Sequence, residues 1–482
     1  MAGNSTAPTK TLLPWIDGRE WQTKEFLESV EAFEGAGTFL VGQADAIALE
    51  AALASAALAS HVMAKMPIHE RSRLLRKLAD LIERDADSLA EGITRATGKA
   101  IKHAQRETRR APWTVRLSAT ACENLSNTNL APDLIPGGEG VVTLSSRRPY
   151  GVVAALTPFN APLNLVAHKA APALAAGNSV IIKPSPFEPG SAIRLAQLCS
   201  EAGFPNGAVN VIPGSLDIGR QFLADSRVSL ITFTGGTRAG KEIHASAGLR
   251  PVLLELGGNS ANIVHKDADI DLAVAECLLG GFSNNGQSCN SVQRIIVHKD
   301  IFDSFLEKMI KIVSTLKIGN PMDLSTDIGP LINEAAAIRV IENIESAKTN
   351  GAIVHAGGFR HGAVLEPTVL TGVKGDERLY LDEAFAPVVM IEKYAELEDA
   401  FERANSTDFA LQVAIFTSSL AVSLQAFNGM RAGSVIVNRS SNFRLDQLPY
   451  GGLGDSGIGR EGPAYVVEAM TYIKNLVIGA QK

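Results

Sequence analysis

The stretch Leu230-Ile231-Thr232-Phe233-Thr234-Gly235-Gly236-Thr237-Arg238-Ala239-Gly240 passes from an apolar strand through two glycines directly into a helix. The unpaired backbone amides at such a helix start, together with the helix dipole, favour a bound phosphate group. A glycine run alone is weak support for a phosphate site, because an ordinary turn has the same composition. The segments on either side therefore decide how this stretch is interpreted.

Apolar runs typical of buried strands alternate with helical patterns along residues 150–258. Such alternation, with short glycine turns, is typical of a parallel, doubly wound sheet that binds its ligand at the carboxyl ends of the strands. We therefore predict an α/β fold with a Rossmann-like nucleotide-binding domain. The predicted strands are 152–156, 179–182, 209–212 and 230–233, and the predicted helices are 168–176 and 192–202.

A second α/β segment follows residue 258 and is the expected catalytic domain. Its predicted elements are helix 301–316 and strands 294–297, 353–356, 368–370, 388–391 and 434–438. Residues 46–127 have a helical pattern, whereas residues 141–148 alternate between turns as an exposed strand or hairpin does. The predicted domains are 1–127 and 148–257 for nucleotide binding, 258–448 for catalysis, and 128–147 with 461–482 for a small β oligomerisation arm and tail.

The composition sets bounds on partners and compartment. The chain has 482 residues, 46% hydrophobic and 20% charged, with a formal net charge of -6. These values are typical of a soluble globular protein of two or three domains, and they argue against nucleic acid as a partner. We find no leader segment and no apolar run near the roughly 20 residues of a membrane span, so no membrane is expected. Four cysteines predict a reducing cytoplasm, and no histidines or cysteines have the spacing of metal ligands.

One of these cysteines lies in the polar turn Asn284-Asn285-Gly286-Gln287-Ser288-Cys289-Asn290. The turn follows the end of an apolar helix at residues 278–282 and precedes a buried strand at 294–298. A thiol in such a turn is accessible, as a nucleophile must be, but a lone cysteine is more often structural. Cys122, Cys199 and Cys277 are expected to be buried or incidental thiols.

Two further side chains have chemical potential. Glu255 lies between leucines at the end of a predicted strand, where burial raises a carboxyl pKa and suits a general base near neutral pH. The other possibility is a structural glutamate on an edge strand. Asn160 follows a strand in a turn bounded by prolines, where its amide either donates to an oxyanion or binds its own backbone.

Taken in order, the segments 156–162, 253–259 and 284–290 resemble the signature of the aldehyde dehydrogenase superfamily, and the resemblance extends over nearly the whole chain. It implies oxidation of an aldehyde to the carboxylic acid, with Cys289 as nucleophile, Asn160 as oxyanion donor and Glu255 as the base that activates water. Coenzyme-A-acylating relatives usually lack this base, so the resemblance favours hydrolysis of the thioester over transfer of its acyl group to a thiol. Further matches are Ile182-Lys183-Pro184-Ser185, Phe233-Thr234-Gly235-Gly236-Thr237, Glu383-Ala384-Phe385-Ala386-Pro387, and Pro449-Tyr450-Gly451-Gly452 followed by Ser456-Gly457.

The resemblance also implies NAD or NADP as cofactor. NAD-preferring members often have a glutamate three positions after the lysine of the 182–185 segment, and this chain has Pro186 there. Because no carboxylate then repels a 2′-phosphate, the choice between NAD and NADP stays open. The implied cofactor-binding residues are Thr157, Pro158, Phe159, Lys183, Ser185, Pro186, Gly214, Phe233, Thr234, Gly235, Gly236, Leu256, Gly257, Glu383 and Phe385.

The sequence gives less information on the substrate than on the reaction and the cofactor. The chain is similar to the branch that oxidises phosphonoacetaldehyde, lactaldehyde and glyceraldehyde 3-phosphate, in which an arginine at the position of Arg110 holds the substrate anion. Arg444 is a candidate second anion clamp. Arg110 also fits a salt bridge with Glu107, and Ser288 replaces the arginine that often precedes the cysteine in phosphate-binding members. The alternative is an aromatic or aliphatic aldehyde, with a pocket lined by Trp113 and Phe443.

The exposed edge of the strand near residues 141–148 is expected to be covered by another chain segment. In the family this arm pairs with another subunit, so a homodimer or homotetramer is expected. Two other classes of function stay open: a catalytically silent structural homologue, and a thioester hydrolase that uses Cys289 without nicotinamide.

Overall fold

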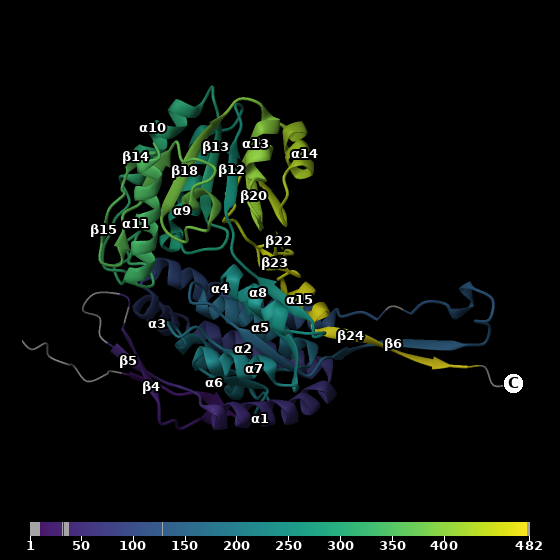
Figure 1. Cartoon of the computed structure of the whole chain (residues 1–482). Coiled ribbons are helices and arrows are strands. Elements are labelled where there is room, and N and C mark those ends of the chain that lie inside the picture. The colour runs from purple at the N-terminus through teal and green to yellow at the C-terminus, as the bar shows by residue number, and fades with distance from the viewer. Residues whose placement is uncertain (1–9, 31, 33–37, 128, 480–482) are drawn as a thin grey trace, which may run out of the picture.

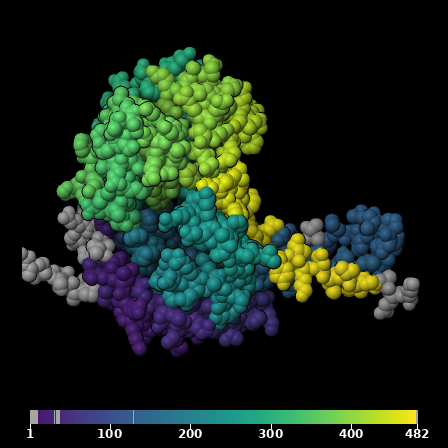
Figure 2. All heavy atoms as spheres, viewed as in Figure 1, coloured from purple at the N-terminus to yellow at the C-terminus, as the bar shows by residue number. Residues whose placement is uncertain are grey.

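Two β-sheets, each covered by helices, form the body of this computed structural model (Figure 1). The structure describes residues 10–30, 32, 38–127 and 129–479. The other residues, which belong to the predicted segments 1–127, 128–147 and 461–482, lie outside the described part. The α/β fold expected from the sequence is confirmed. Figure 1 shows the first sheet in the lower lobe and the second in the upper lobe, and in Figure 2 these lobes are mainly purple to teal and mainly green.

The first sheet has eight strands in the order β23-β11-β10-β7-β8-β9-β2-β3. Strands β7 to β11 are parallel, and the chain order reverses between the neighbours β7 and β10. Such a switch point is where doubly wound sheets bind their ligands. The strands are β2 (Trp15–Ile16), β3 (Arg19–Glu20), β7 (Val152–Leu156), β8 (Ser179–Lys183), β9 (Val209–Val211), β10 (Val228–Thr234), β11 (Val252–Glu255) and β23 (Gly457–Ile458).

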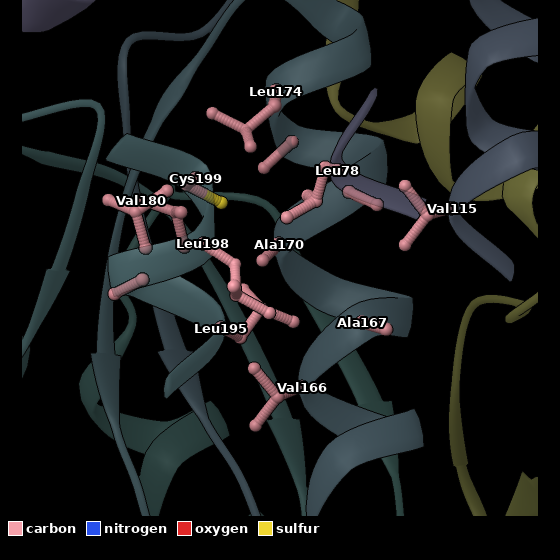
Figure 3. Close-up of a cluster of buried hydrophobic side chains, with 14 of the residues drawn as sticks. Leu78, Val115, Val166, Ala167, Ala170, Leu174, Val180, Leu195, Leu198 and Cys199 are labelled. Atoms are coloured by element: carbon pink, nitrogen blue, oxygen red, sulfur yellow. The ribbon is translucent and has the colours of Figure 1, made fainter. Parts of the chain in front are cut away.

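Helices cover both faces of this sheet. All fifteen residues of α5 are buried, because α5 lies between the sheet and the helices α4, α6 and α15. Figure 3 shows the apolar packing here, with Cys199 among leucines and alanines, and Cys122 and Cys277 are also buried as expected. The helices are α1 (Ala46–Lys65), α2 (Ile68–Arg84), α3 (Ala86–Thr97), α4 (Ile101–Glu123), α5 (Pro162–Ala176), α6 (Gly190–Ala202), α7 (Leu216–Ala224), α8 (Thr237–Ser246) and α15 (Pro463–Ala469).

The second sheet has seven strands in the order β14-β17-β18-β13-β12-β20-β21, of which β14 alone is antiparallel. The neighbouring strands β12 and β20 are not among the predicted strands. Its elements are β12 (Ser260–Val264), α9 (Ile270–Phe282), η2 (Ser283–Gly286), β13 (Val292–His298), α10 (Phe302–Val313), α11 (Glu334–Thr349), β14 (Ile353–Ala356), β17 (Thr368–Thr371), α12 (Arg378–Leu381), β18 (Val388–Tyr394), α13 (Leu397–Ala404), β20 (Gln412–Phe416), α14 (Leu420–Gly429) and β21 (Ser434–Val437).

The chain passes from one sheet to the other through residues 256–259, between β11 and β12. The carboxyl end of the first sheet therefore faces the amino end of the second. Glu255 is the last residue of β11, and Cys289 lies shortly before β13, the neighbour of β12. This junction brings residues that are distant in the sequence into one site.

A two-stranded antiparallel arm projects from the body (Figure 1). It consists of β6 (Val142–Pro149) and β24 (Thr471–Ile478), and it exposes apolar side chains. Helix α15 of the predicted 461–482 segment packs instead against α4 and α5. The smaller elements are β1 (Lys10–Leu12), β4 (Phe26–Val30) and β5 (Thr38–Gly42) in one sheet, the pairs β15 (Arg360–His361) with β16 (Val364–Leu365) and β19 (Phe409–Ala410) with β22 (Leu453–Gly454), and η1 (Pro132–Leu134).

Among the described residues α1 is the one helix long and apolar enough to cross a membrane, with a mean hydropathy of 1.6. The expectation that no apolar run approaches that length is therefore wrong. One such helix is weak support for a membrane span, because core helices of other proteins have the same properties. One face of α1, including Ala52, Ala56 and Met63, is buried against the first sheet.

Candidate active site

An unusual backbone shapes the loop that carries Cys289. Asn284, Asn285 and Gly286 are consecutive left-handed residues, with φ of 54°, 57° and 69°. Asn285 holds the loop through its buried side chain, which accepts from the Gly329 amide (2.9 Å) and donates to the Pro330 carbonyl (2.8 Å). Consecutive left-handed residues cost free energy, and the surrounding contacts maintain them here.

Two glycines let the sequence motifs meet at backbone distance. A Cβ atom on Gly286 would lie 2.0 Å from the Ala386 carbonyl oxygen, and one on Gly258 would lie 1.9 Å from the Cys289 carbonyl oxygen. Only glycine fits at both positions. The segments 253–259, 284–290 and 383–387 therefore form one packed unit around the cysteine.

The Cys289 thiol is half-buried, and its Sγ lies 3.0 Å from the Tyr450 hydroxyl oxygen. Burial raises the pKa of this thiol to about 12, and the carboxylates Glu383 and Glu255 act in the same direction. The hydrogen bond with Tyr450 and the charge of Arg444 lower it. In the free protein the thiol is thus protonated near neutral pH, and forming the thiolate needs a base and groups that stabilise the anion.

Asn160 lies against the same loop. Its Nδ2 donates to the Gln287 carbonyl (3.1 Å), and the Asn284 side chain donates to its backbone carbonyl (3.1 Å). The bond to its own backbone that the sequence left open is not among the hydrogen bonds of the described residues. The amide is therefore within the site, where one of its two N–H groups is bonded to the catalytic loop.

Glu255 is buried, with 5% of its surface exposed, and its Oε2 has no hydrogen-bond partner among the described residues. Burial, followed by the negative charge of Glu461, raises the pKa of this carboxyl well above its usual value. The predicted rise is confirmed. A carboxyl with a raised pKa is suited to general base catalysis near neutral pH.

Behind Glu255 and Tyr450 lies a buried charged network. Arg444 donates to the Glu461 carboxylate (2.8 Å), and Lys169 Nζ lies 3.3 Å from the other oxygen of Glu461. The Arg444 guanidinium also stacks on the Tyr450 ring, 3.8 Å from its centroid. Since the side chain of Arg444 is only 10% exposed, it forms the inner wall of the site.

Arg110 joins this network from α4. Its Nε and Nη2 donate to the two oxygens of Asp446, at 2.7 and 2.5 Å, and His168 Nε2 lies 2.8 Å from the same carboxylate. The salt bridge with Glu107 considered from the sequence is therefore wrong. Glu107 instead pairs with Lys99 and accepts from the first amides of α5.

The remaining substrate candidates differ in placement. Ser288 lies beside the cysteine and donates to Asn290 Oδ1 (2.7 Å). Phe443 is partly buried, with the Arg439 guanidinium over its ring. Trp113 is 61% exposed and contacts Arg116 on the outside of α4, so the structure does not place it in the buried site.

The predicted cofactor residues gather at the carboxyl ends of β7, β8, β10 and β11. Gly235 follows β10, and a Cβ atom there would lie 2.4 Å from the Phe233 ring, whereas the space around Gly236 is open. Gly236 caps α8 without a side-chain hydrogen bond, so the first amides of the helix are free. Thr234 contributes a buried hydroxyl oxygen without a partner among the described residues.

Other cofactor candidates line the same edge. Lys183 ends β8, packs against Gly219 of α7, and has its pKa lowered by burial. Glu383 accepts from the Gly258 amide (3.1 Å), and burial raises the pKa of its carboxyl to about 7. Phe385 stacks edge-on with Phe159, with ring centroids 5.9 Å apart. The others lie on the adjoining loops: Thr157, Pro158, Ser185, Pro186, Gly214, Leu256 and Gly257.

These residues fit a dinucleotide. The open Gly236, the free amides of α8 and the switch point between β7 and β10 suit a pyrophosphate, and Lys183 is positioned for a ribose. Among the described residues no group of three or more histidine, cysteine, aspartate or glutamate side chains could hold a metal ion.

Sequence reasoning missed several residues of the site. Tyr450 was recognised only as part of a motif, and Lys169, Asp446 and Glu461 were not recognised as site residues. A buried charge pair such as Lys169 with Glu461 gives no local signal, because the partners are 292 positions apart.

Comparisons with known proteins agree with this geometry. Residues 15–476 match the aldehyde dehydrogenase family. The 3-sulfolactaldehyde dehydrogenase of Priestia aryabhattai is 42% identical over 411 residues, 85% of this chain and 86% of the relative. Aldehyde dehydrogenase 21 of Physcomitrella patens, solved with its reaction product succinate, has a TM-score of 0.95 at 34% identity, covering 98% of this chain and 99% of that one.

A second solved structure is the NADP-dependent glyceraldehyde-3-phosphate dehydrogenase of Bacillus halodurans C-125 with NADP. It has a TM-score of 0.94 at 31% identity and covers 98% of this chain and 100% of that one. The match to the family spans nearly the whole chain, and the fold and the ordered motifs agree with it. The chain therefore belongs to the aldehyde dehydrogenase family and is an NAD(P)-dependent oxidoreductase that acts on aldehydes.

Proposed function

We propose that this aldehyde dehydrogenase oxidises small aldehydes that carry an anionic group, and that Cys289, Asn160 and Glu255 carry the chemistry. The Cys289 thiolate attacks the aldehyde carbon and forms a thiohemiacetal. Its alkoxide accepts hydrogen bonds from the Asn160 side chain and the Cys289 backbone amide. The segments 156–162, 253–259 and 284–290 pack around the Cys289 thiol, and this packing supports the assignment.

Glu255 acts in the second half of the reaction. Lys183, the amides of α8 and Glu383 would hold NAD(P), which would supply the hydride acceptor for the oxidation of the thiohemiacetal to the thioester. The Glu255 carboxylate then takes a proton from a water molecule, which attacks the thioester carbon. The C–S bond breaks, the carboxylic acid is released and the Cys289 thiolate is restored.

The charge balance of the buried network carries the anionic-substrate proposal. Three cations, Arg110, Lys169 and Arg444, are bonded to two carboxylates, Asp446 and Glu461, which leaves an excess of one positive charge (3 - 2 = 1). Burial favours the uncharged forms of Glu255 and His168, because it raises the pKa of the first and lowers that of the second, so the excess is present while Glu255 holds its proton. An anion near the site is therefore favoured.

The relatives support the same class. The 3-sulfolactaldehyde of one relative carries a sulfonate, the succinate bound to another is a dicarboxylate, and the glyceraldehyde 3-phosphate of the third carries a phosphate. Arg110 is the cation of the network best placed to meet a substrate, because its side chain is 38% exposed and its Nη1 has no hydrogen bond among the described residues. Arg444 is enclosed behind Tyr450 and contributes charge.

A panel of anionic, neutral and aromatic aldehydes with both cofactors tests this proposal. We expect the highest kcat/KM for an anionic aldehyde. Arg110→Ala should raise KM for anionic aldehydes by about tenfold or more and change KM for neutral ones little, since one charge-assisted hydrogen bond is lost. Arg109→Ala, an exposed neighbour on the same helix, is the matched control. A preference for neutral aldehydes, or equal effects of Arg110→Ala on both classes, would contradict the proposal.

We also propose that the protein is a homodimer or homotetramer of the cytoplasm. The projecting ribbon of β6 and β24 exposes apolar side chains on strand edges, and such edges are normally covered by another chain. The four cysteines are free, as suits a reducing compartment. Cell fractionation of the producing organism tests the compartment, and recovery in a membrane or extracellular fraction would contradict it.

A further inference from the structure

Tyr450 contacts the catalytic sulfur but has no role in the reaction described above. Its hydroxyl oxygen lies 3.0 Å from Cys289 Sγ, and the thiol is the hydrogen-bond partner that the described residues give this hydroxyl. The side chain is 3% exposed. The contact is therefore enclosed within the protein, where a polar hydrogen bond is stronger than in water.

The position of this hydroxyl is fixed from two sides. The backbone of Tyr450 exchanges hydrogen bonds with that of Glu461, which forms an isolated antiparallel bridge. The ring is held by the Arg444 guanidinium, 3.8 Å from its centroid, and Arg444 is itself bonded to Glu461. A cation over the ring draws electron density from the phenol and makes its O–H a better donor.

The environment of the sulfur explains why a donor is needed. Two carboxyl groups, Glu255 and Glu383, face Cys289, and burial removes water that would solvate a thiolate. Two groups lower the pKa of the thiol: Arg444, which lies behind the Tyr450 ring, and the Tyr450 hydroxyl, which contacts the sulfur directly. A neutral O–H donor to an anion gives a charge-assisted hydrogen bond, about twice as strong as one between neutral groups.

We propose that Tyr450 is a catalytic residue whose hydroxyl donates a hydrogen bond to the Cys289 thiolate and so increases the reactive fraction of that thiol. When Cys289 ionises, its proton leaves to the Glu255 carboxylate, and the hydroxyl keeps its own proton and points it at the sulfur. Attack on the aldehyde forms the C–S bond and moves the negative charge to the aldehyde oxygen, so Tyr450 is released. When water cleaves the thioester, the C–S bond breaks, and Tyr450 binds the departing thiolate again.

This inference rests on Cys289 as the nucleophile of the proposed function, but it needs no knowledge of the aldehyde. The direct test is alkylation of Cys289 by iodoacetamide across pH 6 to 11 in the full chain, corrected with Cys289→Ser for the buried thiols. In Tyr450→Phe we expect the alkylation profile to move up by about one pH unit, which is a rate about tenfold lower at any pH below the midpoint. An alkylation profile equal to that of the wild type overturns the proposal.

A matched control removes another buried phenol oxygen. Tyr394 is buried in the second lobe, and its hydroxyl lies 2.7 Å from His265 Nδ1. Tyr394→Phe should leave the Cys289 alkylation profile unchanged, whereas an equal shift in both variants would indicate a general loosening of the fold and overturn the proposal. Titration of NAD and NADP binding should give the same affinity in Tyr450→Phe as in the wild type.

A second measurement applies if Tyr450→Phe does not fold. Replacement of all tyrosines by fluorotyrosine keeps every hydroxyl and makes each a stronger donor. The Cys289 alkylation profile should then move to lower pH, and fluorotyrosine in Tyr394→Phe should give the same displacement. No displacement in the labelled wild type overturns the proposal. If the fluorotyrosine protein shows the displaced alkylation profile but is inactive with the aldehydes tested, the result contradicts only the substrate assignment of the proposed function.

Discussion

At the residue scale, the site depends on two groups whose burial makes each hard to ionise. Burial raises the pKa of the Cys289 thiol to about 12 and that of the Glu255 carboxyl well above its usual value. The raised pKa of the Glu255 carboxyl makes its carboxylate a stronger base and so lowers the cost of moving the thiol proton to it. Glu255 therefore has two tasks in sequence: it accepts the thiol proton, loses that proton to solvent, and later accepts the proton of water.

Glu255→Gln tests both tasks. Because the amide can accept neither the thiol proton nor the water proton, we expect the burst of reduced cofactor at pH 8 to slow and the steady state to become at least about 100-fold slower. In the wild type the steady-state rate should fall as pH falls through the raised pKa of Glu255, since the protonated carboxyl cannot activate water. Stopped-flow absorbance at 340 nm measures both phases. A burst at the wild-type rate would show that the thiol proton does not leave to Glu255.

At the scale of single elements, glycines decide how closely the two sheets approach. Gly258 lies in the connection from β11 to β12, with the Cys289 carbonyl where its side chain would be. Gly258→Ala should destabilise the protein by about 3 kcal/mol, the range of an overpacked core position, and displace the thiol from Asn160. Thermal unfolding and steady-state rates measure the two effects. Gly92→Ala is the control, because nothing lies within 4 Å of a Cβ there and a helix gains about 0.5–1 kcal/mol from alanine. Near-wild-type activity in Gly258→Ala would refute the tight approach.

The start of helix α6 makes stability depend on pH. Glu188 is buried there and accepts from the Ser191 amide, and burial raises the pKa of its carboxyl to about 7 from 4.5. Since the folded state binds the proton more tightly than the unfolded state, stability should fall as pH rises from 4.5 to about 7, by up to about 3 kcal/mol. Glu188→Gln keeps the acceptor and removes the charge. It should match the wild type at pH 5 and exceed its melting temperature at pH 8, and equal melting temperatures at both pH values would refute this account.

At the scale of the whole molecule, the arm is the part that a single chain leaves uncovered (Figure 2). Ile473 and Val477 point to one side of β24 and are 58% and 63% exposed. Replacing both with lysine should convert the oligomer to monomers, because buried charges at an interface are costly. Light scattering after gel filtration measures the mass. The matched control places lysine at Ile47 and Leu58 on α1, which are 71% and 72% exposed. A monomeric wild type would contradict the proposed assembly.

Some strands and motif positions of the whole molecule could be predicted from the sequence. Strands β7 and β14 match their predicted ranges, because their apolar runs end at clear turns. Local patterns gave the order of the motifs and the positions of Cys289 and Glu255. They did not give β12 and β20, although turn residues precede both strands, at 257–259 and 405–408.

Pairings across the chain could not be predicted. The sequence offered Glu107 as the neighbour of Arg110 on the helix, but the partner is Asp446, 336 positions away. Tyr450 and Cys289 are 161 positions apart, and only the folded junction of the two sheets brings their side chains together. Periodicity reports which face of an element is buried and carries no information on which side chain lies opposite.

The left-handed loop before the cysteine has a consequence for the chemical ageing of the protein. Asn285-Gly286 is the dipeptide most prone to deamidation, because the glycine nitrogen can close a succinimide ring on the asparagine side chain. In the folded protein both ends of the Asn285 amide are occupied, by Gly329 and Pro330, so the side chain cannot swing into the ring-closing geometry. Stored enzyme should keep this asparagine as long as it stays folded. Partial unfolding would convert it irreversibly to aspartate or isoaspartate and remove the contacts that shape the catalytic loop, so brief heat damage would persist after cooling.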